Sequence, residues 1–141
     1  MKPALVDDRY LSEVLRGIEV PQLEGRALFT TGYWYVRLCQ AVLAGRSISG
    51  VLSGPFASLP DSIRSQATAA VMQLPDAIGL VSLRELGPLM GGLRRYHSLN
   101  VLGMEALAAA KYLDADVFLR SASPQLQAAL AHEGLSVQFA A

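Results

Sequence analysis

The acidic residues that could do chemistry stand where a predicted strand ends. Asp7 and Asp8 come directly after the apolar residues 4–6, which predict a short buried strand. Ligand sites of open α/β sheets form at the carboxyl ends of strands, so a carboxylate there could bind a cation or act on a substrate. Aspartate is also a favoured helix N-cap, and we expect that role for Asp8 more than for Asp7. Asp7 is therefore the stronger functional candidate.

A second acidic candidate lies in the C-terminal third of the chain. Glu105 falls within the Ala-rich residues 99–113, whose apolar spacing predicts a helix. A glutamate in a helix is usually solvated, so this position alone does not indicate a ligand. Asp116 precedes the predicted strand 117–119 and belongs to the opposite end of the sheet. We do not expect Asp116 to bind a ligand.

Basic and polar residues near predicted strand and helix ends could contact phosphates. Arg94 and Arg95 come just before the helix that holds Glu105. Arg120 and Ser121 follow the strand after that helix, at its carboxyl end. Guanidinium groups bind phosphate oxygens well, so these residues form the candidate substrate-binding set. The alternative is a solvated helix end, where cations also interact favourably with the helix dipole.

Strand and helix patterns alternate along the chain. Apolar and β-branched runs predict five strands, at residues 4–6, 27–31, 78–82, 117–119 and 135–139. Helical spacing predicts helices at residues 8–16, 33–43, 61–74, 83–96, 99–113 and 124–133. Pro88 and the pair Gly91-Gly92 should kink or break the helix 83–96, and residues 45–60 should form the longest loop. The order predicts a three-layer α/β/α fold with a central, mostly parallel five-stranded sheet.

The composition fits a single domain over residues 1–141. Hydrophobic residues make up 52% and charged residues 17%, with a net charge of zero, which argues against a strongly basic nucleic-acid binder. The single Cys39 excludes an intramolecular disulfide and a cysteine-rich zinc site, and the spacing of His97 and His132 does not suggest zinc.

Two further expectations concern surroundings and self-association. No apolar run reaches the ~18 residues of a membrane span, so we expect a cytoplasmic protein without membrane contact. The low charge leaves room for an apolar contact face, to which the Ala-rich residues 104–113 and the apolar residues 139–141 could contribute. We therefore expect a homo-oligomer.

Two stretches of the sequence resemble a known family. LNVLGMEALAAAKYLDADVFLRSASPQLQAALAHEGLSV has an acidic residue opening an Ala-rich helix, then a strand, a polar turn, a helix and a last strand. ALVDDRYLSEVLRG has a short strand, an aspartate at its end and a helix. Both resemble the ends of PIN domains, the family that includes the VapC-type ribonuclease toxins. The element order fits across the chain, while the middle is generic in sequence.

The resemblance implies a metal-dependent ribonuclease site that is only partly kept. PIN domains hold Mg²⁺ or Mn²⁺ in a cluster of carboxylates, and by position Asp7 and Glu105 correspond to two of these catalytic ligands. Asp8 could lend a third ligand. Residues 31–36 lack the family's glutamate, and Ser121 stands where an aspartate is usual. The loss is serious, because a hard divalent cation needs several oxygen ligands.

We therefore expect a PIN-like domain with a degenerate metal site, non-catalytic or weakly active, that binds RNA or a protein partner. The alternative is an active Mg²⁺- or Mn²⁺-dependent endoribonuclease that uses Asp7 and Glu105, the toxin of a toxin–antitoxin pair. In that case an antitoxin is the expected protein partner, and the metal ion is the expected cofactor.

Overall fold

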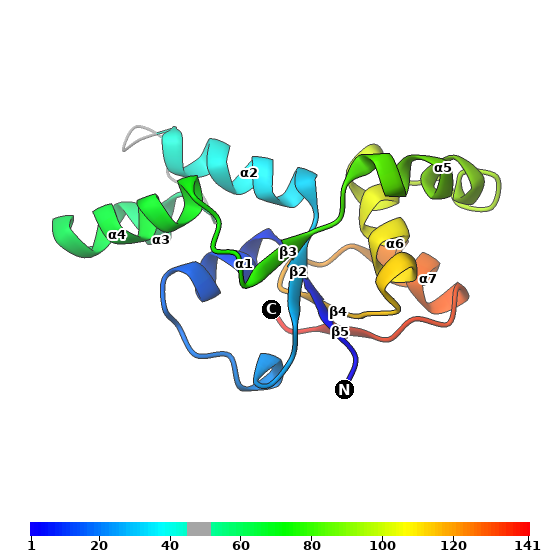
Figure 1. Ribbon diagram of the computed structural model, residues 1–141, viewed down its shortest axis with the longest axis horizontal. Coiled ribbons are helices and arrows are strands. Elements are labelled where there is room, and N and C mark those ends of the chain that lie inside the picture. The colour runs from blue at the N-terminus through cyan, green and yellow to red at the C-terminus, as the bar shows by residue number, and fades with distance from the viewer. Residues whose placement is uncertain (45–51) are drawn as a thin grey trace.

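A parallel sheet of five short strands runs through the protein (Figure 1). The computed structural model describes residues 1–44 and 52–141. The strands are β1 (Ala4–Val6), β2 (Leu28–Thr30), β3 (Ile78–Leu80), β4 (Asp116–Leu119) and β5 (Val137–Phe139). The helices are α1 (Asp8–Leu15), α2 (Gly32–Leu43), α3 (Gly54–Ala57), α4 (Asp61–Met72), α5 (Leu83–Leu93), α6 (Val101–Leu113) and α7 (Pro124–His132), with a 3-10 turn η1 at Pro21–Leu23. The predicted α/β fold is confirmed.

The strand order places a reversal point between β1 and β4. The order is β3-β2-β1-β4-β5, and every neighbouring pair is parallel. From β1 the chain moves outward to β2 and β3, and then returns to the other side of β1 for β4 and β5. Ligands of open α/β sheets bind at the carboxyl ends of the strands beside such a reversal. Asp7 and Arg120 follow β1 and β4 directly and so lie at this edge.

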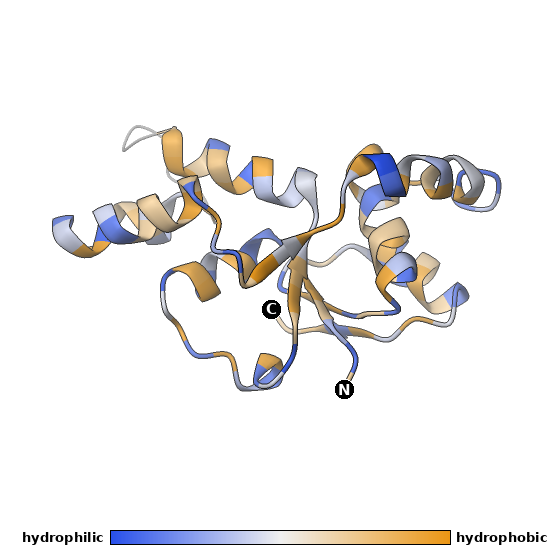
Figure 2. Cartoon of the chain, viewed as in Figure 1, coloured by the Kyte–Doolittle hydropathy of each residue, from blue (hydrophilic) through white to orange (hydrophobic). Residues whose placement is uncertain are grey.

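Each face of the sheet packs against its own layer of helices (Figure 1). Leu5 and Val117 belong to the core beneath α5, α6 and α7, whereas Val6 and Phe118 belong to the core beneath α1, α3 and α4. Because successive side chains of a strand point to opposite faces, strands covered on both sides are apolar throughout. Figure 2 shows hydrophobic colours along the strands. No described helix is long and apolar enough to cross a bilayer.

The Ala-rich helix α6 lies at the centre of one layer. Residues 103–110 are all buried, because small side chains allow α6 to lie close to the sheet and to its neighbouring helices. We expected this helix to form part of a homodimer face. That expectation is wrong for α6, since the protein's own layers cover its small side chains. Phe139 of β5, from the other predicted contact segment, is 43% exposed.

Two element boundaries differ from the prediction. Helix α5 continues through Pro88 to Leu93, so of the predicted kink or break the break does not occur. The missing N–H of Pro88 removes only one hydrogen bond, and the paired glycines lie in the last turn, where the helix ends anyway. The predicted loop 45–60 contains the short helix α3, whose Phe56 is buried in the core. Residues 45–51 of that predicted loop lie outside the described residues.

Candidate functional site

Asp7 is built into the reversal point of the sheet. It is 1% exposed and is the N-cap of α1, where its Oδ1 accepts a hydrogen bond from the Tyr10 N–H at 2.9 Å. Its Oδ2 accepts the backbone N–H groups of Arg120 at 2.8 Å and Ser121 at 3.1 Å. The carboxylate thus joins the start of α1 to the turn after β4, and backbone N–H groups occupy both of its oxygens.

Asp8 is the first residue of α1, and its Oδ2 accepts no hydrogen bond from the described residues. This oxygen is buried, and the Nε of Arg37 on α2 lies 3.4 Å away as its ion-pair partner. We expected Asp8 rather than Asp7 to be the cap. The cap is Asp7, because it has the extended backbone that precedes a first helical residue. Burial raises the pKa of both carboxyls, against the opposing effect of backbone N–H groups at Asp7 and of Arg37 at Asp8.

Glu105 is fully buried and holds the N-terminus of α2. Its Oε1 accepts the Tyr33 N–H at 2.8 Å, and its Oε2 accepts the Gly32 N–H at 3.1 Å. Thr31, the N-cap, accepts the next free N–H of the helix, that of Trp34. The first N–H groups of a helix have no partner within it and carry partial positive charge. The Glu105 carboxylate therefore supplies the hydrogen-bond acceptors that these N–H groups lack, and the N–H groups supply the donors that the buried carboxylate needs.

Because Gly32 has no side chain, the Glu105 carboxylate can lie close to the backbone at the start of α2. A Cβ at this position would lie 3.1 Å from Glu105 Oε2, which is closer than ordinary van der Waals contact. Glu105 is thus not a solvated helix residue, because each of its carboxylate oxygens accepts a backbone N–H. Burying this polar group without such hydrogen bonds would be costly.

The predicted metal ligands are not part of a compact group of ligand atoms. Among residues 1–44 and 52–141, the one group of three whose ligand atoms lie within 4.8 Å of one another is His97, His132 and Glu133. Asp7, Asp8 and Glu105 do not belong to it, and their role as metal ligands stays a prediction. Asp116 lies at the amino end of β4, as predicted, where its Oδ2 accepts a 2.6 Å hydrogen bond from Arg26.

Arg120 forms an ion pair with Glu13. Its Nε donates to Glu13 Oε2 at 2.8 Å and its Nη2 to Oε1 at 3.2 Å, a two-point contact that raises the pKa of Arg120. The guanidinium also lies over the ring of Tyr10, with its carbon 4.3 Å from the ring centre. Of the two predicted substrate-binding residues after β4, Ser121 donates its N–H to Asp7, and Arg120 is neutralised by a carboxylate.

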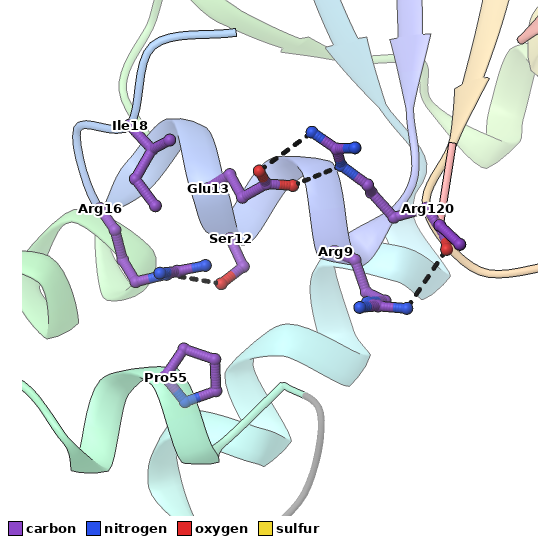
Figure 3. Close-up of a pocket in the computed structure, with 8 residues that line it drawn as sticks. Arg9, Ser12, Glu13, Arg16, Ile18, Pro55 and Arg120 are labelled. Carbon is purple, nitrogen blue, oxygen red and sulfur yellow. Dashed lines mark hydrogen bonds and ion pairs between the residues drawn. The ribbon is translucent and has the colours of Figure 1, made fainter. Parts of the chain in front are cut away.

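A pocket of about 350 Å³ opens beside this ion pair (Figure 3). Its lining includes Arg9 and Ser12 of α1, and Arg16 directly after α1. Pro55 of α3 and Arg120, which follows β4, line it from other parts of the fold. The Arg9 guanidinium donates to the Arg120 carbonyl at 3.2 Å, and the Arg16 guanidinium donates to the Ser12 hydroxyl at 3.2 Å. We name these lining residues the arginine pocket.

The predicted substrate-binding set omits Arg9 and Arg16, although the sequence carries a signal for them. Arg9, Ser12 and Arg16 are spaced three and four positions apart, so a helix starting at Asp8 places them on one face. The predicted Arg94 and Arg95 lie after α5 and do not line the arginine pocket. Arg94 donates to the Leu99 carbonyl at 2.9 Å, and the Arg95 guanidinium lies 5.9 Å from the ring centre of the neighbouring tyrosine.

No protein-family model, no curated protein and no solved structure matches this chain. The resemblance to PIN domains stays a prediction, and the geometry of the residues themselves is the basis for assigning a function.

Replacing Glu105 tests whether its carboxylate anchors α2. Glu105→Gln should lower the free energy of unfolding by about 1–3 kcal/mol, because an NH₂ group then faces a buried backbone N–H. Urea unfolding followed by circular dichroism measures the change. Glu24→Gln, the same substitution at an exposed position, should change it by less than about 0.5 kcal/mol. Wild-type stability in Glu105→Gln would contradict the anchoring role.

Gly32→Ala tests the same contact from the side of α2. The added Cβ would press on Glu105 Oε2, so stability should fall here too. The loss in the double variant Gly32→Ala/Glu105→Gln should be smaller than the sum of the single losses, because both changes disturb one contact. Additive losses in the same urea experiment would show that the two residues act independently.

Proposed function

We propose that this chain is a PIN-like α/β domain that binds RNA through the arginine pocket and does not use a metal ion to do so. The observation that carries the proposal is that the carboxylates and the arginines have different surroundings. The buried carboxylates of Asp7 and Glu105 are bound by backbone N–H groups. The guanidinium groups of Arg9 and Arg16 line a pocket and donate to neutral oxygens.

The carboxylates fit a resident Mg²⁺ or Mn²⁺ poorly. Such an ion needs several oxygen ligands whose lone pairs are available. Asp7 accepts three backbone N–H groups and Glu105 accepts two, so an ion at either carboxylate would compete with hydrogen bonds that hold α1 and α2. We therefore assign no cleavage step to these residues.

The arginine pocket has the chemistry of a phosphate site. Arginine presents a planar set of N–H donors that matches phosphate oxygens, and Ser12 adds a hydroxyl between the two arginines on α1. Glu13 does not neutralise the pocket completely, because its carboxylate forms its two-point contact with Arg120. The pocket also lies beside the loop after β4, next to the reversal point where α/β sheets bind ligands. Both the PIN-like interpretation and the phosphate-binding chemistry of the pocket favour a cytoplasmic RNA strand as the partner.

RNA binding should persist without divalent ions. We expect a fluorescently labelled single-stranded RNA to bind the protein in EDTA, measured by anisotropy. If Arg9 and Arg16 each neutralise one phosphate, log K should fall with log salt with a slope of about −1.4. The double variant Arg9→Gln/Arg16→Gln should lose most of this salt dependence and bind at least about tenfold more weakly.

Two further variants locate the binding surface. Lys2→Gln removes one positive charge at the opposite end of the sheet, beside Asp114, and should leave RNA affinity unchanged. If Arg94→Gln/Arg95→Gln weakens binding and the Arg9/Arg16 variant does not, the RNA surface is the end of α5. If no RNA binds in EDTA, the proposal is wrong and a protein partner becomes the better hypothesis.

A weakly active metal-dependent endoribonuclease is the second candidate, favoured by one observation. The buried Oδ2 of Asp8 accepts no hydrogen bond from the described residues, and its charged neighbour is the Arg37 Nε at 3.4 Å. A cation bound there would oppose the effect of burial, which raises the pKa of Asp8.

Calorimetric titration of Mn²⁺ into the protein separates the two candidates. Because an ion here would compete with Arg37 for Asp8 and with backbone N–H groups for Asp7, we expect no saturable binding at this edge up to millimolar metal. Saturable binding that Asp8→Asn abolishes would contradict the metal-free proposal and restore the endoribonuclease. Binding that survives Asp8→Asn but vanishes in His132→Gln would assign the ion to the separate histidine group at the end of α7.

A further inference from the structure

Two histidines and a glutamate meet on the side of the protein that carries α5 and α7. His97 follows α5, His132 is the last residue of α7, and Glu133 is the residue after it. We expected no zinc site because His97 and His132 are far apart in the sequence. The fold brings their ring centres to 5.3 Å, so the spacing was a misleading guide to their proximity.

The ligand atoms converge on one carboxylate oxygen. His97 Nε2 lies 2.7 Å from Glu133 Oε2, and His132 Nδ1 lies 3.6 Å from the same oxygen. Ligand atoms of the three residues all lie within 4.8 Å of one another. An ion held at about 2.0–2.2 Å from each would need only small side-chain movements. The ion would take the place of any hydrogen on His97 Nε2: a neutral imidazole then carries its one hydrogen on Nδ1, and a doubly protonated ring releases one proton to solvent.

Two of the three side chains, those of His97 and Glu133, are mostly buried, and the third, that of His132, is exposed to solvent. The side chains of His97 and Glu133 are 9% and 12% exposed, whereas that of His132 is 72% exposed. His132 lines both of the shallow pockets that adjoin the group, one towards Leu99 and one towards Pro88. His97 and Glu133 thus form a preset pair that His132 completes from the solvent side, with room for water at the remaining positions.

Lys111 of α6 orients the glutamate. Its ammonium group donates to Glu133 Oε1, which leaves Oε2 facing the two imidazoles. Glu133 therefore has Lys111 at one carboxylate oxygen and His97 at the other. A hydrogen-bonded partner behind a ligand is typical of metal centres. The positive charge of Lys111 also opposes an incoming cation, which predicts moderate affinity.

We propose that His97, His132 and Glu133 bind a borderline transition-metal ion, of which Zn²⁺ is the first to test. Imidazole nitrogens favour zinc and its neighbours over Mg²⁺ or Ca²⁺, which prefer oxygen ligands. Two histidines and one carboxylate leave a fourth position for water or another ligand. This site shares no residue with the arginine pocket, so metal binding here and RNA binding there can be tested independently.

The proposal is tested by adding Zn²⁺ to the metal-free protein and following heat release and thermal unfolding. We expect one ion per chain and a thermal midpoint that rises as Zn²⁺ exceeds its Kd, since the ion ties the segment after α5 to α7. His132→Gln should weaken binding at least about tenfold, because it removes one of the imidazole ligands. This side chain is largely exposed, so its loss should leave the fold intact.

Controls separate this site from other zinc ligands. Cys39→Ser removes the lone thiol of the chain and should bind Zn²⁺ like the wild type. His97→Gln retains a side-chain donor towards Glu133 and should also lose binding. Co²⁺ should give visible absorption bands of a low-coordinate nitrogen–oxygen site that vanish in both histidine variants. Absence of saturable Zn²⁺ binding, or wild-type affinity in His132→Gln, would overturn the proposal.

Discussion

Buried carboxylates bound by helix N-termini hold together the edge of the sheet at its reversal point. Asp7 and Glu105 lie far apart in the sequence, and each one accepts hydrogen bonds from backbone N–H at the start of a helix. A helix start leaves N–H groups without partners, and a buried carboxylate needs donors, so each satisfies the other. The same contacts fix α1 to the turn after β4 and α2 to α6. The layered arrangement of the helices around the reversal point depends on them.

This use of carboxylates determines what chemistry remains at the edge. Lone pairs that accept backbone N–H groups are not available to a metal ion or a proton relay, whereas guanidinium groups nearby still face a pocket. The ion pair between Glu13 and Arg120 has the same effect, since it occupies the carboxylate of α1 that lines the pocket. An anion is therefore better matched to this surface than a cation. Under the proposed PIN-like interpretation, the domain keeps the layout of a metal-dependent nuclease while its edge presents the opposite charge.

Much of the fold could be predicted from the sequence, because strand and helix periods are local. The strands at 4–6 and 117–119 and the helix after Asp7 follow from spacing alone. The partners of Asp7 and Glu105 could not be predicted in this way. Their donors are backbone N–H groups, which every residue except proline carries, so no side-chain type marks Tyr33 or Ser121 as a partner.

Long-range proximity and burial explain the remaining errors. Nothing local shows that His97 meets Glu133, because the contact depends on how α5 and α7 pack on α6. The Ala-rich residues correctly predicted a helix and wrongly predicted its surroundings, since small residues serve close packing inside a protein as well as between proteins. Pro88 does not end α5, because a helix can lose one hydrogen bond when its other contacts hold it.

The proposal that arginines at the reversal point bind RNA while the carboxylates serve the fold can be tested residue by residue. Isotope-labelled protein would be titrated with a short RNA in EDTA and followed by amide NMR spectra. We expect shifts concentrated at Arg9, Ser12, Arg16 and Arg120, with the amides of the first two residues of α2 still protected from hydrogen exchange by Glu105. Shifts confined to the end of α5, or shifts that appear only after Mg²⁺ is added, would contradict this role of the arginines.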